Sequence, residues 1–218
     1  MREGGSLPRL EFEPNSHKYR LDGDYIPGLT TVLSDCGLTD SRWAKEEHRD
    51  RGTAVHDLCA EIALFERPES QFEWDGTCDK PIAVPYGQSF LKGIRALGFV
   101  VEPGMLEVGV FSAIYLCAGT FDMWGYQGKR RALIDVKSGQ PSPGVDIQLA
   151  GYRVMARESL GIEIDVCYAL WLDKDGGMPK VVQPKNPMSD ERIFKSMMEI
   201  WWWRKTHGML PWKGNGNG

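Results

Sequence analysis

Hydrophobic and polar positions change period several times along the chain, and each change predicts a different element. Between residues 10 and 33, short alternating runs around a turn signal predict small strands. Residues 41–51 are charged and have helical spacing, and we expect this helix to stop at Gly52. Thr53 is a good N-cap for a second helix, which ends near Arg67 after an apolar stripe with a period of 3.6 residues.

The second half of the chain is richer in strands. Residues 69–85 indicate a loop, and the helix after it is closed by Gly98. Short connections then predict antiparallel neighbours among three strands. A further helix, ended by Gly161, separates them from the last strands. The expected elements are a helix at 86–97, strands at 105–111, 115–126 and 130–137, a helix at 145–159, strands at 163–172 and 180–183, and a helix capped by Ser189 that runs to 205. This order predicts the α/β class.

The length of 218 residues suits one domain, which we place at residues 10–212. Residues 1–9 and 213–218 are expected to be disordered tails. Apolar runs stay well below the ~18 residues of a membrane span, and the first residues do not resemble a signal peptide. We therefore expect a cytoplasmic protein that does not act at a membrane.

Cysteine spacing and net charge exclude few classes of protein. The five cysteines lie far apart without a C-x-x-C pair, which argues against a disulfide framework, a zinc ribbon or an iron–sulfur cluster. The formal net charge of −4 is not that of a protein that coats DNA. It does not exclude a nuclease, because bound divalent cations can supply positive charge among acidic residues.

Two charged residues end an apolar run at Leu133–Ser138. Period two puts Asp135 and Lys137 on one face of the predicted strand, and a simple ion pair at a strand end would explain them. Asp122 lies on the preceding strand, so the two carboxylates can share a face, and a divalent cation between them would relieve their repulsion. Gly119, near Asp122, would let a ligand approach closely.

Two helices add further polar residues. Gln148 and Tyr152 share a helix face at spacing i and i+4, with Arg153 beside them, which would suit a phosphate backbone. An ordinary amphipathic helix explains the same residues. His56 borders the apolar stripe of its helix, where a structural histidine is the usual explanation. Arg51 lies five residues earlier and is a candidate for binding DNA.

Taken together, four short motifs resemble the RecB-like nucleases of the PD-(D/E)XK superfamily, a group that includes recombination, CRISPR-associated, phage and mitochondrial exonucleases. Each motif is weak alone, but they occur in the family's order over residues 17–172, and the opening residues 17–31 also look like phage and mitochondrial members. The motifs are Gly52-Thr-x-x-His56, Gly119-Thr-Phe-Asp122, Ile134-Asp-Val-Lys-Ser138 and Gln148-x-x-x-Tyr152.

The resemblance implies a central mixed sheet flanked by helices and a metal-dependent DNA nuclease. Asp122, Asp135 and Lys137 would be the catalytic group, and Gln148 and Tyr152 would hold the active site and the DNA strand, with Arg153 and Arg51 as further DNA contacts. The ligands of Mg²⁺ or Mn²⁺ would be His56, Asp122, Asp135, the carbonyl of Val136 and, in some members, Glu107. The cysteine spacing of the family's iron–sulfur members is absent.

The family further implies an exonuclease that acts on linear DNA, single- or double-stranded, in recombination, repair or phage DNA processing, encoded by a bacterium or a phage. A recombination or annealing protein would be a second partner. Three alternatives stay open: a catalytically idle DNA-binding or assembly module, a structure-specific endonuclease, and a metal-dependent hydrolase of another substrate. The tryptophans at 201–203 could stack on bases, although consecutive residues of a helix point in different directions, which favours core packing for at least two of them.

Overall fold

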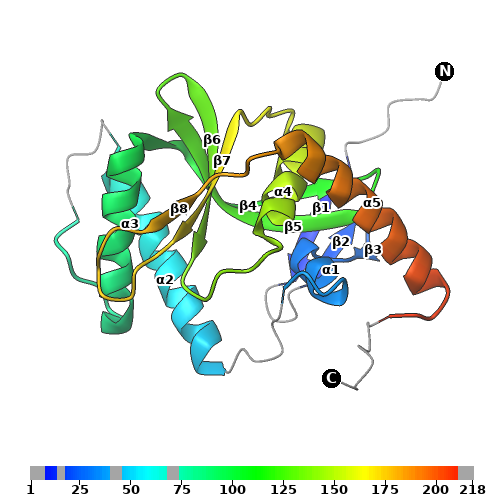
Figure 1. Cartoon of the computed structure of the whole chain (residues 1–218), viewed down its shortest axis with the longest axis horizontal. Coiled ribbons are helices and arrows are strands. Elements are labelled where there is room, and N and C mark those ends of the chain that lie inside the picture. Colours follow the sequence, from blue (N-terminus) through cyan, green and yellow to red (C-terminus); the bar gives the residue numbers. More distant parts are fainter. Residues whose placement is uncertain (1–7, 14–17, 40–45, 68–73, 211–218) are drawn as a thin grey trace.

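A computed structural model describes residues 8–13, 18–39, 46–67 and 74–210, with the backbone alone at 46–49. The described residues do not include His17 of the opening motif. Of the expected tails they include only residues 8 and 9. A mixed five-stranded sheet forms the centre of the molecule, in the order β4-β5-β6-β7-β8 (Figure 1). Its neighbours are antiparallel except for the parallel pair β6 and β7. The strands are β4 (Phe99–Ser112), β5 (Cys117–Gln127), β6 (Arg130–Lys137), β7 (Val166–Trp171) and β8 (Lys180–Val182).

Helices cover both faces of this sheet, so the expected mixed sheet flanked by helices is confirmed. On one face lie α2 (Glu46–Phe65) and α3 (Val84–Leu97), preceded by the 3₁₀ helix η1 (Pro81–Ala83). On the other lie α1 (Leu29–Asp35), α5 (Pro187–Thr206) and α4 (Val145–Leu160), which connects the parallel strands (Figure 1). The alternation of β6 serves both layers, since Leu133 packs toward α4 and α5 and Ile134 toward α2 and α3.

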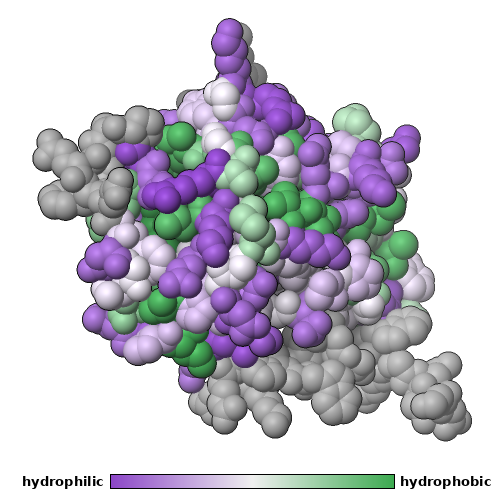
Figure 2. Space-filling model, turned by 60° about the vertical axis from the view of Figure 1, so that its left-hand side comes forward, coloured by the Kyte–Doolittle hydropathy of each residue, from purple (hydrophilic) through white to green (hydrophobic). Residues whose placement is uncertain are grey.

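A small antiparallel sheet packs against one end of the large one. Its strands β1 (Leu10–Glu13), β2 (Lys18–Leu21) and β3 (Asp24–Ile26) bury Tyr19, Leu21 and Ile26 beside Ala118 of β5. The chain then forms a bridge between Gly28 and Ala118 and enters α1, which fixes α1 next to β5. Hydrophilic side chains cover most of the molecular face in Figure 2, with small groups of apolar residues between them.

Four predictions about elements were wrong. Gly52 does not end a helix and Thr53 does not cap one, since both lie within α2, where packing of the apolar stripe outweighs the ~1 kcal/mol that a helical glycine costs. Residues 29–35 form a helix where we expected strand structure. The last helix begins at Pro187 after Asn186, so Ser189 is not its N-cap. Among the described helices, none is long and apolar enough to cross a membrane.

Candidate metal centre

Asp122 and Asp135 lie where β5 and β6 separate. The regular pairing of these strands extends as far as Met123 opposite Ile134, so the next position on each strand is an aspartate. Both are buried, with exposed fractions of 7% and 3%. The Val136 N–H donates its hydrogen bond to Oδ2 of Asp122 and not to a backbone carbonyl of β5. The end of the β5–β6 ladder therefore creates an acidic opening inside the sheet.

His56 reaches this opening from α2. Its Nδ1 lies 3.0 Å from Oδ1 of Asp122 and 3.8 Å from Oε1 of Glu107. The helix face next to His56 is anchored by the buried Val55 and Cys59, so the imidazole stands at the inner edge of α2. The histidine is thus joined to the acidic opening and is not an isolated core residue.

Glu107 lies just after an irregularity in β4. The pairing of β4 with β5 shifts register between Val101 and Leu106, and Glu107 has a φ of 49° in the left-handed region. A residue with a side chain adopts that conformation at a cost of about 1–2 kcal/mol, and such residues concentrate at functional sites. The register on either side, Leu106 opposite Met123 and Val108 opposite Phe121, sets Glu107 across from Asp122.

Lys137 connects the acidic pair to α4. Its Nζ lies 2.7 Å from Oδ2 of Asp135 and donates a hydrogen bond of 3.0 Å to Oε1 of Gln148. The Nε2 of Gln148 in turn donates to the hydroxyl of Tyr152 at 3.1 Å. The expected shared face of Gln148 and Tyr152 is therefore present, and it is turned toward the end of β6.

Burial and close charges shift the ionisation of the whole cluster. Burial alone would lower the pKa of His56, but the Asp122 carboxylate, with Glu107, raises it to about 10. Burial would raise the pKa of Asp122, and the contact with His56 lowers it overall. For Asp135, burial and the charge of Asp122 raise the pKa to about 6 despite Lys137. Burial and the two carboxylates keep the pKa of Tyr152 well above its usual value, so its hydroxyl stays neutral.

This donor set suits a divalent cation. Ligand atoms of His56, Glu107 and Asp122 all lie within 4.8 Å of one another. The Oδ2 of Asp135 is buried and has no aligned hydrogen-bond donor, although Lys137 Nζ is near, so it has a lone pair left for a ligand. The carbonyl of Val136 faces the same edge as its N–H, toward Asp122, because both groups of one residue point the same way in an extended strand. A hard cation with mixed oxygen and imidazole ligands fits these atoms.

The structure does not bring every predicted residue to this centre. Arg153 lies between α4 and α5, where its Nη2 is 3.6 Å from Oε1 of the buried Glu191. Arg51 packs against the ring of Tyr86 between α2 and α3. Neither arginine therefore belongs to the cluster at the end of β5 and β6, and their contacts with DNA stay predictions.

Gly119 also has a different role from the one expected. A Cβ at this position would come within 2.9 Å of Cε1 of Tyr152, so the glycine makes room for that ring and not for a ligand. Sequence reasoning did not find the strained backbone of Glu107 or the use of the Val136 N–H. Both depend on where two strands separate, and the only local signal was an acidic residue in an otherwise apolar strand.

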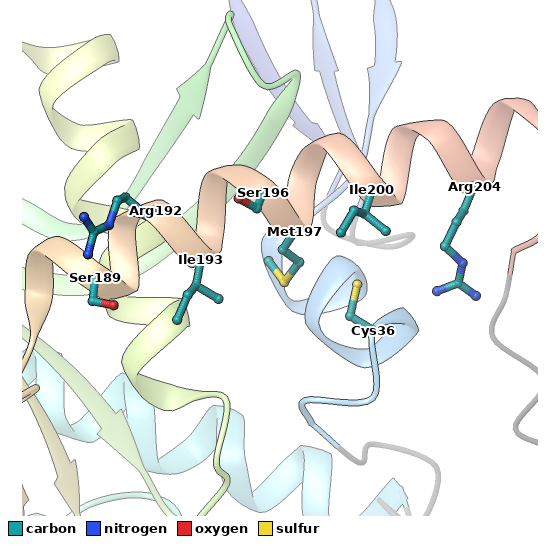
Figure 3. Close-up of a pocket in the computed structure, with 8 residues that line it drawn as sticks. All are labelled: Cys36, Ser189, Arg192, Ile193, Ser196, Met197, Ile200 and Arg204. Atoms are coloured by element: carbon teal, nitrogen blue, oxygen red, sulfur yellow. The ribbon is translucent and has the colours of Figure 1, made fainter.

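An apolar groove lies elsewhere on the described surface. It has a volume of about 470 Å³ and runs along α5 to the end of α1, where Met197 and Ile200 project toward Cys36 (Figure 3). Two arginines lie among its lining residues but no carboxylate does, so it has no metal-binding set.

Comparison with known proteins adds no identification to this geometry. No protein-family model matches the chain, and no curated protein matches its sequence.

Proposed function

We propose that the chain is a metal-dependent DNA nuclease of the PD-(D/E)XK type, and that it hydrolyses phosphodiester bonds from DNA ends. The observation that carries this proposal is the meeting of Asp122, Asp135, Lys137 and His56 at the separating ends of β5 and β6. Support also comes from the element order, in which helices precede three antiparallel strands, and α4 leads to the parallel strand β7. The preference for an exonuclease rests on the family resemblance of the motifs.

The acidic residues and the histidine of this cluster are the proposed metal ligands. Asp122, Asp135 and His56, with the carbonyl of Val136 and the side chain of Glu107, would hold Mg²⁺ or Mn²⁺, and the imidazole favours Mn²⁺. The bound cation supplies positive charge that stabilises the developing phosphate charge and makes water more acidic.

Lys137 acts next to that ion. The Asp135 carboxylate and the Gln148 amide hold its Nζ in place, where it can orient the attacking water or donate to the phosphate oxygens in the transition state. Gln148 is fixed in turn by Tyr152, whose neutral hydroxyl accepts from the amide. Two buried partners therefore hold the lysine in one orientation, which is the pre-organisation that catalysis by charge requires.

The first test compares DNA cleavage by the wild type, Asp135→Ala and Lys137→Ala in Mg²⁺, Mn²⁺ or chelator. We expect cleavage by the wild type in either metal, none in chelator, and a loss of at least about 100-fold in both variants. Asp24→Ala and Lys180→Ala are matched controls, because both residues are exposed on other strands. Equal cleavage by all proteins would contradict the assignment.

The form of the DNA separates the related functions. An exonuclease should degrade linear DNA with free ends and leave circular or end-blocked DNA intact. Cleavage of circular DNA at branched or unpaired positions would identify an endonuclease. Binding of metal without cleavage of any DNA would identify a catalytically idle module.

A further inference from the structure

Helix α5 exposes large apolar side chains on the side opposite its buried residues. Phe194, Met198 and Trp201 are buried and fix the helix to the core. Four other apolar residues of the helix are between 48% and 70% exposed: Met188, Ile193, Ile200 and Trp203. Scattered apolar residues are ordinary on a protein surface, whereas several on one helix beside an apolar groove are typical of an interface.

A seam with the period of a coiled coil runs along this exposed side. Its positions are separated alternately by four and three residues: Ser189, Ile193, Ser196, Ile200 and Trp203. This average of 3.5 residues keeps the side chains on the line that faces a partner helix. Figure 3 shows Ile193 and Ile200 pointing to the same side of α5. The two serines are small, so the backbone of another helix can come close between the larger side chains.

Two opposite charges flank the seam. Arg192 precedes Ile193, Glu199 precedes Ile200, and both charged side chains are exposed. The charged residues are seven positions apart, ~10 Å along the helix, whereas side chains pair within a helix at spacings of three or four. Within the described part of the chain, neither takes part in an ion pair. Both charges are therefore available to a second molecule.

The order of these residues along α5 is self-complementary. Measured from the point between residues 195 and 196, Arg192 and Glu199 lie equally far in opposite directions. Met188 and Trp203 do so as well, and the two isoleucines of the seam are centred one residue further on. A second α5 that packs antiparallel about this point therefore sets arginine against glutamate twice and apolar side chains against each other. An interface between identical copies related by a two-fold axis requires this property.

We propose that two copies of this chain form a dimer through antiparallel packing of α5, with the two-fold axis near Ser196. Arg192 of each copy pairs with Glu199 of the other, and Met188 of each packs on Trp203 of the other. The dimer does not depend on the proposed nuclease function. One helix of 20 residues per copy, ~30 Å long, is a small interface, so the dimer is reversible at micromolar concentrations.

Charge reversal at the two flanking positions tests the pairing. Arg192→Glu and Glu199→Arg each put like charges at both pairs, so each variant alone should associate at least tenfold more weakly than the wild type. Lys180→Glu is the control, because it makes the same charge change at an exposed residue of β8. It should dimerise as the wild type does.

The measurement is sedimentation velocity of the full chain from about 1 to about 200 µM, a range that spans micromolar dissociation constants. A reductant is present so that the free cysteines cannot cross-link the copies. Circular dichroism first confirms that each variant is folded.

Mixing the two variants distinguishes this register from a general effect of charge. An equimolar mixture of Arg192→Glu and Glu199→Arg has opposite charges at both pairs, so it should form a heterodimer although neither variant dimerises alone. The double variant R192E/E199R has the two charges exchanged on one chain and should dimerise as the wild type does.

Four results would overturn the dimer as described. A wild type that stays monomeric over the whole range would mean that α5 faces a different partner or none. Association that both single variants retain in full would show that another surface joins the copies. Failure of both the mixture and the double variant to dimerise would exclude the antiparallel register. Trimers or larger rings would exclude it too, because a two-fold interface closes at two copies.

Discussion

Each oxygen of the Asp122 carboxylate has its own partner. Oδ1 faces His56 and Oδ2 accepts from the Val136 N–H, and these contacts favour the charged carboxylate. Asp135 is in the opposite situation, because burial and the charge of Asp122 raise its pKa to about 6 even though Lys137 Nζ lies 2.7 Å from its Oδ2. Of the two aspartates, Asp135 is therefore the one that a cation would stabilise more.

The Asp135→Asn variant tests that difference. A carboxyl whose pKa is raised on folding stabilises the protein below its unfolded pKa of 3.8, and this contribution is lost as the pH rises through about 6. In chelator at pH 7.5, roughly one unit or more above that range, the asparagine variant should be more stable than the wild type, on the order of 1–3 kcal/mol. At pH 4 the two proteins should unfold at similar temperatures.

Thermal unfolding at both pH values measures this, with and without Mn²⁺. The metal should raise the melting temperature of the wild type and not that of Asp135→Asn. A variant that is less stable than the wild type at pH 7.5 without metal would show that the ion pair with Lys137 outweighs the cost of burying the charge.

The sequence pattern was enough to predict that three residues of this cluster share one face of the sheet. Asp122, Asp135 and Lys137 were expected on one face from the period of two and a tight turn, and the structure brings them together with His56. Their roles in catalysis stay predictions. The positions of Arg51 and Arg153 could not be predicted, because a helix offers several faces to an arginine and the partner, Glu191 in the case of Arg153, lies far along the chain.

At the scale of elements, the pattern predicted periodic segments better than their interruptions. Turn signals and αL glycines located the ends of α3 and α4, where Gly98 and Gly161 have φ values of 60° and 66°. The short helix α1 was missed because its seven residues are held by contacts to β5 and α4, which no local periodicity reports. The irregular part of β4 before Glu107 was missed for the same reason.

The contact between β5 and α4 gives a prediction at this scale. Gly119→Ala would place a Cβ 2.9 Å from Cε1 of Tyr152 and 3.4 Å from Cε of Met155, so the tyrosine ring must move. Its hydrogen bond to Gln148, which holds Lys137, should then be lost. We expect the rate of DNA cleavage to fall at least about tenfold, with an overpacking cost of about 1–3 kcal/mol in stability.

The matched control is Gly109→Ala on β4, where the nearest atom to the new Cβ is the flexible end of Leu10 at 3.3 Å. It should cleave DNA as the wild type does. If Gly119→Ala also retained the full rate while folded, the position of Tyr152 would have no influence on Lys137.

At the scale of the whole molecule, one sheet joins two apolar layers. Phe90 of α3 and Phe194 of α5 are both fully buried, each on its own face of the sheet. Neither layer can lose its packing without exposing β6, whose Leu133 and Ile134 serve the two layers alternately. The candidate metal centre lies within this shared part, at the end of β5 and β6, so its geometry depends on both layers.

This arrangement predicts that the described part of the chain unfolds as one cooperative unit. Phe90→Leu and Phe194→Leu each remove buried contacts from one layer, at about 1–2 kcal/mol, which corresponds to a fall of roughly 2–8 °C in a single melting transition. Far-ultraviolet circular dichroism and tryptophan fluorescence, recorded in chelator, should give the same midpoint in each variant. Two separate melting transitions would mean that the layers fold independently, if Phe90→Leu lowered the midpoint only of the transition in which the layer of α2 and α3 unfolds. In that case α2 could detach with His56 while β5 and β6 keep Asp122 and Asp135 in place, and the metal centre would be assembled only when both layers are folded.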